Sequence, residues 1–302
     1  MFDLRQLQAL SAVAQAENFD RAAREMHLTQ SAVSQRIRAL EAQAGQPLLI
    51  RGKPVRPTEA GAALLRYYRQ MEGLQDAAMR ELSASSGGSL RLSIAVNADS
   101  LATWLPEVLD RLLQEHALWL DLQVDDQDVT HHILRTGAVV GCISALDQRV
   151  QSCDRVALGA MRYIAVATQD FVHEYFADGL SANALIRAPV IEFNDRDSTQ
   201  AEFMRRRFGV SRGEYNYHQI PSSEGFQDMI LRGRGWSMLP VAQALPYIEA
   251  GQLLRIAPDA SVLMPLYWHV WNIATPLIRS LTTTLTEVAG RQLETIRPDA
   301  ST

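Results

Sequence analysis

Apolar residues recur at helical spacing through the first sixty residues of the chain. Within residues 20–40, Val33, Ile37 and Leu40 share one face of a helix, because residues three and four apart lie on the same side. The opposite face carries short polar side chains. Asp20 is expected to cap the first of two short helices. The pattern predicts two helices joined by a tight turn, and one face of the second helix is polar.

The polar face of the second helix has the chemistry of a DNA-contacting surface. Short hydroxyl and amide side chains form hydrogen bonds with phosphates or base edges, and arginine forms bidentate hydrogen bonds with guanine in the major groove. Gly45 ends the helix, and residues 48–58 read as two extended pieces around Gly52-Lys53-Pro54, a pattern typical of a basic wing. The alternative is an ordinary solvated helix, since lookalikes of this motif are common. The expected DNA-binding residues are Thr29 (also the cap of the second helix), Gln30, Ser31, Ser34, Gln35, Arg38, Arg51, Lys53 and Arg56.

Charge is distributed unevenly along the chain. The formal net charge is -5, yet residues 20–58 contain seven Lys/Arg against three Asp/Glu. Positive charge is therefore concentrated where phosphates would be met. Lys53 is the only lysine in the sequence, so arginine supplies almost all of the cationic chemistry and its bidentate contacts.

Residues 59–82 predict one long helix, with Thr58 as its cap and Glu59 in the positive first turn. An apolar stripe recurs along it at steps of three and four residues: Leu64, Tyr67 or Tyr68, Met71, Leu74, Ala78 and Leu82. Such a stripe directly after a DNA-binding unit indicates a dimer seam. Packing of the helix on its own wing is the alternative, and the two are compatible. The small residues 83–89 then predict a hinge.

From residue 90 the pattern changes to alternating strands and helices, which predicts parallel sheets with crossover helices. The expected strands are residues 90–96, 118–124, 138–144, 162–168, 189–193, 214–220, 235–240 and 266–272. The expected helices are residues 101–115, 128–136, 198–208, 224–232, 241–250 and 276–296. This order predicts two α/β lobes joined by crossing strands, with a ligand cleft between them at the carboxyl ends of the strands.

Composition fits a protein of two or three domains that works inside the cell. The chain has 302 residues, of which 47% are hydrophobic, and no signal peptide or membrane-spanning run is recognised. The cytoplasm is the expected location. Cys142 and Cys153 are the only cysteines and lack the spacing of a zinc site. A redox switch is weighed against plain structural cysteines, and the latter are preferred. No cofactor, metal or catalytic residue is expected.

Polar residues at the strand ends mark the expected cleft. The loop after the first strand opens into a helix, where backbone N–H groups and the hydroxyls of Ser100 and Thr103 would hold an anionic group such as a carboxylate. Carboxylates near the same edge would favour a ligand that carries both a positive and a negative charge. Taken one by one, most of these acids are better interpreted as solvated loop charges or helix caps. The expected effector residues are Asn97, Asp99, Ser100, Thr103, Asp125, Asp126, Ser144, Asn194, Asp195, Ser223 and Glu224.

The N-terminal segment closely resembles the winged helix-turn-helix of LysR-type transcriptional regulators. The resemblance covers residues 4 to about 61 and is carried by LRQLQAL (4–10), AVA (12–14), Phe19, AA (22–23) and LTQSAVSQRIRALE (28–41). It implies an α/β protein in which a DNA-binding unit (1–58) and a linker helix with hinge (59–89) precede an effector domain (90–302) similar to periplasmic solute-binding proteins. Lobe I of that domain is expected at about 90–163 and 267–302, and lobe II at about 164–266. The implied partners are a double-stranded DNA operator, further copies of the chain in a homodimer or homotetramer, and RNA polymerase.

Longer stretches of the effector domain resemble the lysine- and arginine-responsive ArgP/LysG branch of that family. They are residues 89–109, 120–127, 138–144, 221–226 and 266–269. The branch implies that L-lysine or L-arginine is the effector and that a basic amino-acid exporter gene is the target. The sequence departs from the branch at residues 193–200 and 210–213, where the end of a ligand side chain would be read.

Three other functions are weighed. A LysR-type regulator of another small metabolite would keep the fold and change the ligand. A DNA-organising or origin-binding protein would bind DNA with a steep salt dependence and without a ligand. An enzyme is disfavoured, because no nucleophile triad, metal-ligand set or phosphate loop is recognised.

Overall fold

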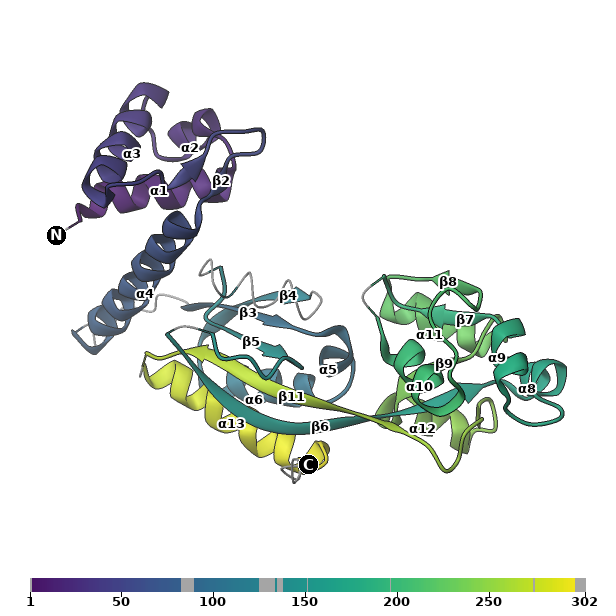
Figure 1. Ribbon diagram of the computed structural model, residues 1–302. Coiled ribbons are helices and arrows are strands. Elements are labelled where there is room, and N and C mark those ends of the chain that lie inside the picture. The colour runs from purple at the N-terminus through teal and green to yellow at the C-terminus, as the bar shows by residue number, and fades with distance from the viewer. Residues whose placement is uncertain are drawn as a thin grey trace, which may run out of the picture.

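The computed structural model describes residues 2–82, 90–124, 134, 138–150, 152–195, 197–273 and 275–296. A small helical domain lies at the N-terminus, one long helix leads away from it, and two α/β lobes follow (Figure 1). Two long strands run from one lobe into the other. The helical domain and the lobes have separate hydrophobic cores.

The helical domain is built on three helices, α1 (Leu4–Ala16), α2 (Phe19–Glu25) and α3 (Gln30–Ala44). Val33, Ile37 and Leu40 are fully buried on one face of α3, as their spacing predicts. Thr29 caps α3, because its hydroxyl accepts a hydrogen bond from the Ala32 N–H at 3.2 Å. The hydrophobic side chains of one face therefore fix which face of α3 is left for other contacts.

One predicted cap in this domain is wrong. Asn18, not Asp20, caps α2, since its Oδ1 accepts from the N–H groups of Asp20 and Arg21 at 2.8 and 3.1 Å. Asp20 lies inside the first turn, where its negative charge complements the helix dipole. The helix consequently begins one residue earlier than the predicted cap.

The predicted wing is present as two short antiparallel strands, β1 (Leu49–Ile50) and β2 (Arg56–Pro57). Gly45 ends α3 with φ of 72°, a conformation that glycine adopts without strain. The wing then leads directly into the long helix α4 (Glu59–Leu82), which Thr58 caps through the Gly61 N–H at 3.1 Å.

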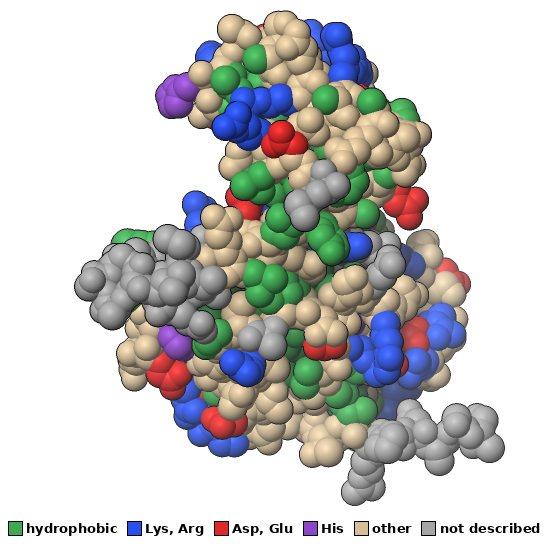
Figure 2. All heavy atoms as spheres, turned by 90° about the vertical axis from the view of Figure 1, so that its left-hand side faces the viewer, with side chains coloured by type: hydrophobic (Ala, Val, Ile, Leu, Met, Phe, Trp, Pro, Cys, Tyr) green, Lys and Arg blue, Asp and Glu red, His purple; other side chains and the backbone are tan. Residues whose placement is uncertain are grey.

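The apolar residues of α4 divide into two sets. Tyr68 and Leu65, which the predicted stripe did not include, are buried against the helical domain, and Leu64 is partly buried there. Tyr67, Met71 and Leu74 are 66%, 41% and 51% exposed. Figure 2 shows hydrophobic side chains at the surface below the N-terminal helical domain. Tyr67, Met71 and Leu74 thus leave an apolar strip of α4 exposed to solvent.

The sheet of lobe I is mixed and not wholly parallel as predicted, because β5 (Gly141–Ser144) pairs antiparallel with the long strand β11 (Val262–Trp271). β3 (Leu90–Val96) pairs in parallel with β4 (Leu118–Val124) on one side and β5 (Gly141–Ser144) on the other. Helix α6 (Leu105–Glu115) packs against α13 (Pro276–Gln292), so the end of the chain returns to this lobe, as predicted. The core of lobe I contains Trp104 and Trp268 among aliphatic side chains and is continuous with that of the second lobe.

The helix predicted at residues 101–115 is broken in two. A short helix α5 (Ala98–Ala102) ends at Thr103, and α6 begins after Trp104 with Pro106 in its first turn. Proline suits the first turn of a helix because its missing N–H would have no partner there, whereas inside a longer helix it would remove a bond. The break leaves Asp99 on a short separate element at the end of β3.

Two long antiparallel strands connect the lobes, β6 (Cys153–Ala167) and β11 (Val262–Trp271). In lobe II β6 pairs with β9 (Ser237–Pro240) and β10 (Leu254–Arg255), while β7 (Val190–Glu192) and β8 (Tyr217–Gln219) form a parallel pair. The helices of lobe II are α8 (Gln169–Tyr175), α9 (Ala182–Arg187), α10 (Thr199–Phe208), α11 (Ser223–Leu231) and α12 (Val241–Glu249).

The crossing strands are pinned where they leave lobe I. Gly159 has φ of 132°, and a Cβ there would lie 2.9 Å from the Glu294 carbonyl oxygen. The next residue, Ala160, exchanges two backbone hydrogen bonds with Glu294, at 2.8 and 3.0 Å. Glycine is required at this crossing because the C-terminal segment lies directly on the strand.

The elements of lobe II that no pattern predicted are α8, α9 and the short strand β10. Strand β6 also begins at Cys153, ahead of the predicted residue 162. The helix predicted at residues 128–136 lies outside the described residues except for Leu134, which is buried. Within the described ranges, every helix is too short or too polar to span a bilayer.

Candidate DNA interface and ligand pocket

The nine expected DNA-binding residues lie on α3, at its N-cap and in the wing. Ser34 is half-buried and the other eight are exposed. A hollow of about 470 Å³ lies between the two elements, and Gln30, Ser34, Arg51 and Lys53 line it. Lys and Arg side chains are visible on the DNA-binding domain in Figure 2. The arrangement offers a helix face beside a basic wing.

Most of the Lys and Arg side chains on these elements form no ion pair within the described residues. Arg51 pairs with Glu41 at 3.7 Å. In the described part of the chain, Arg38, Lys53 and Arg56 have no ion-pair partner. Unpaired arginine and lysine side chains exchange counterions for DNA phosphates, which is the main source of affinity for DNA.

Arg38→Ala tests whether Arg38 reads a base. Specific DNA binding is expected to weaken by about 1–3 kcal/mol, while binding to random DNA changes much less. Electrophoretic mobility or anisotropy titrations on both DNAs measure the difference. Arg187→Ala, which removes one exposed arginine from lobe II, is the matched control. An equal loss on random DNA would show that Arg38 contacts only phosphate.

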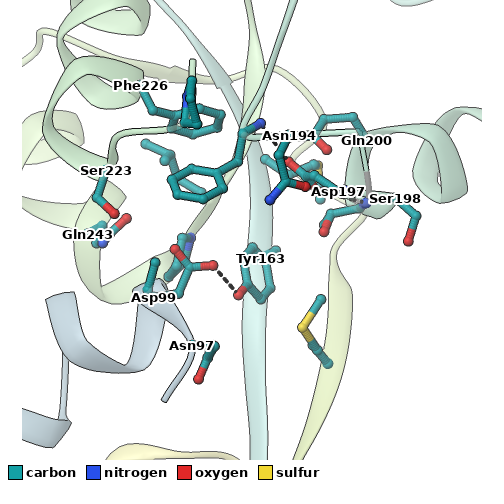
Figure 3. Close-up of a pocket in the computed structure, with 18 of the residues that line it drawn as sticks. Asn97, Asp99, Tyr163, Asn194, Asp197, Ser198, Gln200, Ser223, Phe226 and Gln243 are labelled. Carbon is teal, nitrogen blue, oxygen red and sulfur yellow. Dashed lines mark hydrogen bonds between the residues drawn. The ribbon is translucent and has the colours of Figure 1, made fainter. Parts of the chain in front are cut away.

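A cavity of about 670 Å³ lies between the two lobes. Lobe I, the crossing strands and lobe II all contribute to it. Figure 3 shows the polar side chains that surround it. The lining residues are Asn97, Ala98, Asp99, Val124, Tyr163, Phe193, Asn194, Asp197, Ser198, Thr199, Gln200, Pro221, Ser222, Ser223, Phe226, Met238, Leu239, Pro240, Gln243 and Met264.

Asp99 is held in the cavity wall by Tyr163. The Tyr163 hydroxyl donates to Asp99 Oδ2 at 2.5 Å, across the gap between α5 and β6. Burial raises the pKa of Asp99 to about 6; the negative charge of Asp197 adds to the rise and the Tyr163 bond opposes it. A carboxylate whose charge is poorly solvated attracts a cation strongly.

Asp197 supplies a second carboxylate from lobe II. Its two oxygens accept from the N–H groups of Phe193 and Thr199, each at 3.1 Å, so that it closes the loop before α10. The sequence analysis missed it, although an Asp that bonds the backbone N–H two residues on is a recognised turn signal. Among the lining residues that the structure describes, two are Asp and none is Lys, Arg or His.

Four of the expected effector residues line this cavity: Asn97, Asp99, Asn194 and Ser223. Asp125 and Asp126 lie outside the described residues. Ser100, Thr103, Ser144, Asp195 and Glu224 are not among the lining residues.

Local hydrogen bonds explain why several of these residues do not line the cavity. Ser100 is buried and its Oγ accepts from Trp104 Nε1 at 3.1 Å. Thr103 donates to the Asp99 carbonyl at 2.6 Å, so both hydroxyls of the expected anion site are occupied within the chain. Ser144 accepts from the Leu146 N–H at 3.1 Å. The Asp195 side chain is 82% exposed.

Three helices of lobe II begin at the cavity. Ser198 and Thr199 open α10, Ser222 and Ser223 open α11, and Pro240 precedes α12. The N-terminus of a helix carries a partial positive charge. The sequence analysis placed the anion-binding end at α5, whereas the larger convergence of helix starts is in lobe II.

A buried ion cluster supports the lobe II wall of the cavity. Glu192, whose side chain is fully buried at the end of β7, pairs with Arg212 at 2.7 Å and accepts from the Tyr215 hydroxyl at 2.7 Å. Arg212 also donates to the Asp195 carbonyl oxygen and lies over the Tyr217 ring at 5.3 Å. The cluster therefore holds the loop that carries Asn194 and Asp197.

The two cysteine thiols have raised pKa values and stay protonated near neutral pH. Cys142 is buried and Cys153 is partly buried, and neither is in a disulfide. Burial raises the pKa of Cys153 to about 11 and raises that of Cys142 still further. Reactive thiols have lowered pKa values, so both groups favour the structural interpretation.

A winged helix-turn-helix joined through a long helix to a two-lobed α/β domain is the architecture of a bacterial transcriptional regulator. Residues 4–62 match the family described as "Bacterial regulatory helix-turn-helix protein, lysR family", and residues 85–290 match "LysR substrate binding domain". The chain belongs to the LysR family.

Individual relatives cover nearly the whole chain. The HTH-type transcriptional regulator ArgP of Pseudomonas fluorescens (strain Pf0-1) is 41% identical over 295 residues, 97% of this chain and 99% of its own. The crystal structure of ArgP from Mycobacterium tuberculosis has a TM-score of 0.89 and 38% identity, covering 96% of this chain and 98% of its own. Full-length LysG from Corynebacterium glutamicum with bound effector Arg has a TM-score of 0.82 and 32% identity, covering 97% and 99%. These relatives are regulators, not enzymes.

Proposed function

We propose that this LysR-type regulator binds a basic amino acid, L-lysine or L-arginine, between its lobes and thereby controls a basic amino-acid exporter gene. The observation that carries the proposal is the pair of carboxylates, Asp99 and Asp197, in a cavity whose described lining has no cationic side chain. The two half-buried carboxylates repel each other, so a cation bound between them would be stabilised by both.

The polarity of the cavity fits an amino acid. The cationic group would lie between Asp99 and Asp197, and the α-carboxylate would face the start of α11, where the helix dipole favours negative charge. The arginine bound to LysG supports the same ligand class for a relative of 32% identity. The resemblance to that branch is the basis for the exporter gene as target.

Effector binding would be coupled to DNA binding through the lobes and α4. Ligand drawing the two lobes together would change the effector domain, and α4 would carry that change to the DNA-binding surface. The exposed stripe of Tyr67, Met71 and Leu74 supports association of two copies along α4. A homodimer or homotetramer would then place its recognition helices on successive half-sites of a double-stranded operator and act on RNA polymerase.

Calorimetric titration of the full chain tests the proposal. L-lysine is compared with L-norleucine and L-arginine with L-citrulline. Each analogue has a similar shape and an uncharged side chain. Saturable binding of the basic pair is expected, with the analogues at least about tenfold weaker, since each tenfold step corresponds to about 1.4 kcal/mol.

A titration in the presence of operator DNA follows the first. The ligand that binds is expected to change the affinity or the footprint on DNA, because two coupled sites influence each other reciprocally. Binding of none of the four ligands would contradict the proposed effector class. A regulator of another metabolite or a ligand-independent DNA-binding protein would then be favoured.

A further inference from the structure

Gln200 lines the cavity from the first turn of α10 and is 1% exposed. Its side-chain nitrogen donates to Ser237 Oγ at 2.7 Å and to the Ile191 carbonyl at 3.3 Å. Its side-chain oxygen, Oε1, is buried and has no hydrogen-bond partner among the described residues. A buried amide oxygen without a partner costs about 1–3 kcal/mol, so an unpaired acceptor at a cavity points to a donor on a ligand.

The orientation of the Gln200 amide is determined by its neighbours. The Ser237 hydroxyl has one proton, and it donates to the Ile191 carbonyl at 2.6 Å. Ser237 Oγ can therefore only accept from Gln200, which requires the amide nitrogen on that side. Exchanging the nitrogen and oxygen would bring Oε1 against two acceptors. The unpaired atom is thus the oxygen.

A second unpaired acceptor lies on the opposite lobe. Asn97, at the start of α5, lines the same cavity, and its Oδ1 also has no partner in the described part of the chain. Figure 3 shows Asn97 and Gln200 on different sides of Tyr163 and Asp99. Together with two carboxylates, the cavity presents acceptors to its ligand, and an ammonium has three N–H donors and a guanidinium has five.

We propose that Gln200 is a specificity-determining residue: its Oε1 accepts a hydrogen bond from an N–H of the ligand's cationic group. This inference rests on the proposed function and deepens it, because charge alone would let Asp99 and Asp197 hold any cation. Gln200 adds a requirement for a hydrogen-bond donor.

Gln200→Met keeps the length of the side chain and removes the acceptor. Titration of the full chain is expected to show at least about tenfold weaker binding of L-lysine, whereas L-norleucine binding stays the same or improves. The measured quantity is the ratio of the two Kd values. A residue that only braces β7 against β9 would weaken both ligands equally and leave the ratio unchanged, and that result would overturn the proposal.

Ser237→Ala is the matched control, since it breaks the same buried network and leaves the acceptor in place. Its Kd ratio is expected to equal that of the unaltered chain. If Gln200→Met does not fold, Nε,Nε,Nε-trimethyl-L-lysine on the unaltered chain decides. Its side-chain cation keeps the charge but has no N–H donor, so at least about tenfold weaker binding than L-lysine is expected, and equal binding would overturn the proposal.

The two levels of inference fail separately. If the unaltered chain binds neither L-lysine nor L-arginine, the proposed function fails and the role of Gln200 fails with it. If the unaltered chain binds them and Gln200→Met leaves the ratio unchanged, the effector class stands and only the role of Gln200 is lost.

Discussion

Replacing Asp99 by Asn is expected to weaken binding of L-lysine and L-arginine by about 30- to 150-fold. The change removes one negative charge from a wall with few other ligands for a cation, and a hydrogen bond to a charged group contributes about 2–3 kcal/mol in such a site. The Asn side chain still accepts the Tyr163 hydroxyl bond, so the geometry of the wall is kept. L-norleucine and L-citrulline should bind the variant and the unaltered chain alike.

The pH dependence of binding gives an independent signature of Asp99. Its pKa is raised to about 6 by burial, and a cation prefers the deprotonated form. Affinity for L-lysine is therefore full above about pH 7 and falls by up to about tenfold per unit as the pH drops below 6. Asp99→Asn should flatten this profile between pH 5 and 8. A variant that keeps the slope would show that another group titrates.

The same substitution is expected to stabilise the protein without ligand. A carboxyl group whose folded-state pKa lies above its unfolded value of about 3.9 binds the proton more tightly when folded, so stability falls as the pH rises from about 4 to 6. A neutral Asn avoids that loss. At pH 7 the gain should be roughly 1–2 kcal/mol, allowing for solvent screening at a partly exposed group.

Thermal melts at pH 7 and calorimetric titrations measure the two effects together. Asp178→Asn is the matched control, because Asp178 is an exposed aspartate of lobe II that does not line the cavity. It should leave both Tm and affinity close to those of the unaltered chain. A lower Tm for Asp99→Asn would contradict the assignment of Asp99 as a strained ligand-binding charge.

The DNA-binding domain could be predicted closely from the sequence because local signals agree there. The spacing of Val33, Ile37 and Leu40, the Thr29 cap and the Gly45 stop all lie within one helix and its ends. The wing follows within a few residues. Each signal is short-range, so no tertiary contact is needed to find it.

The cavity could be predicted only in part because its walls come from distant segments. Asp99 and Asn97 follow a strand end, which parallel sheets place at the cleft. Tyr163 lies in the middle of a long crossing strand, and Gln200 reads as an ordinary helix residue. Their roles depend on a hydrogen bond across 64 residues and on a network between residues 191 and 237. No local pattern signals either.

Arg212→Met is expected to destabilise lobe II by about 3 kcal/mol. Arg212 neutralises Glu192, whose side chain is fully buried, and removing one partner of a buried pair leaves an uncompensated charge. The estimate is at the low end of the usual range because the Arg212 side chain is 34% exposed. For a domain of this size the Tm should fall by roughly 6–12 °C.

Tryptophan fluorescence measures this effect selectively. All five tryptophans lie at residues 104, 119, 236, 268 and 271, within the two lobes, so the melt reports their unfolding and not that of the DNA-binding domain. The double variant with Glu192→Gln should recover most of the lost Tm, because it removes the stranded charge. Equal Tm values for Arg212→Met with and without Glu192→Gln would show that the pair is not the source of the loss.

Arg212→Lys separates the two tasks of the arginine. Lysine keeps the positive charge beside Glu192, so the Tm should stay near that of the unaltered chain. A single ammonium lacks the planar fork of the guanidinium, with which Arg212 contacts Glu192 and the Asp195 carbonyl oxygen at once. The loop that carries Asp197 would lose its anchor, and affinity for L-lysine should fall several-fold at nearly constant Tm. Unchanged affinity would confine Arg212 to stability and make the loop self-supporting.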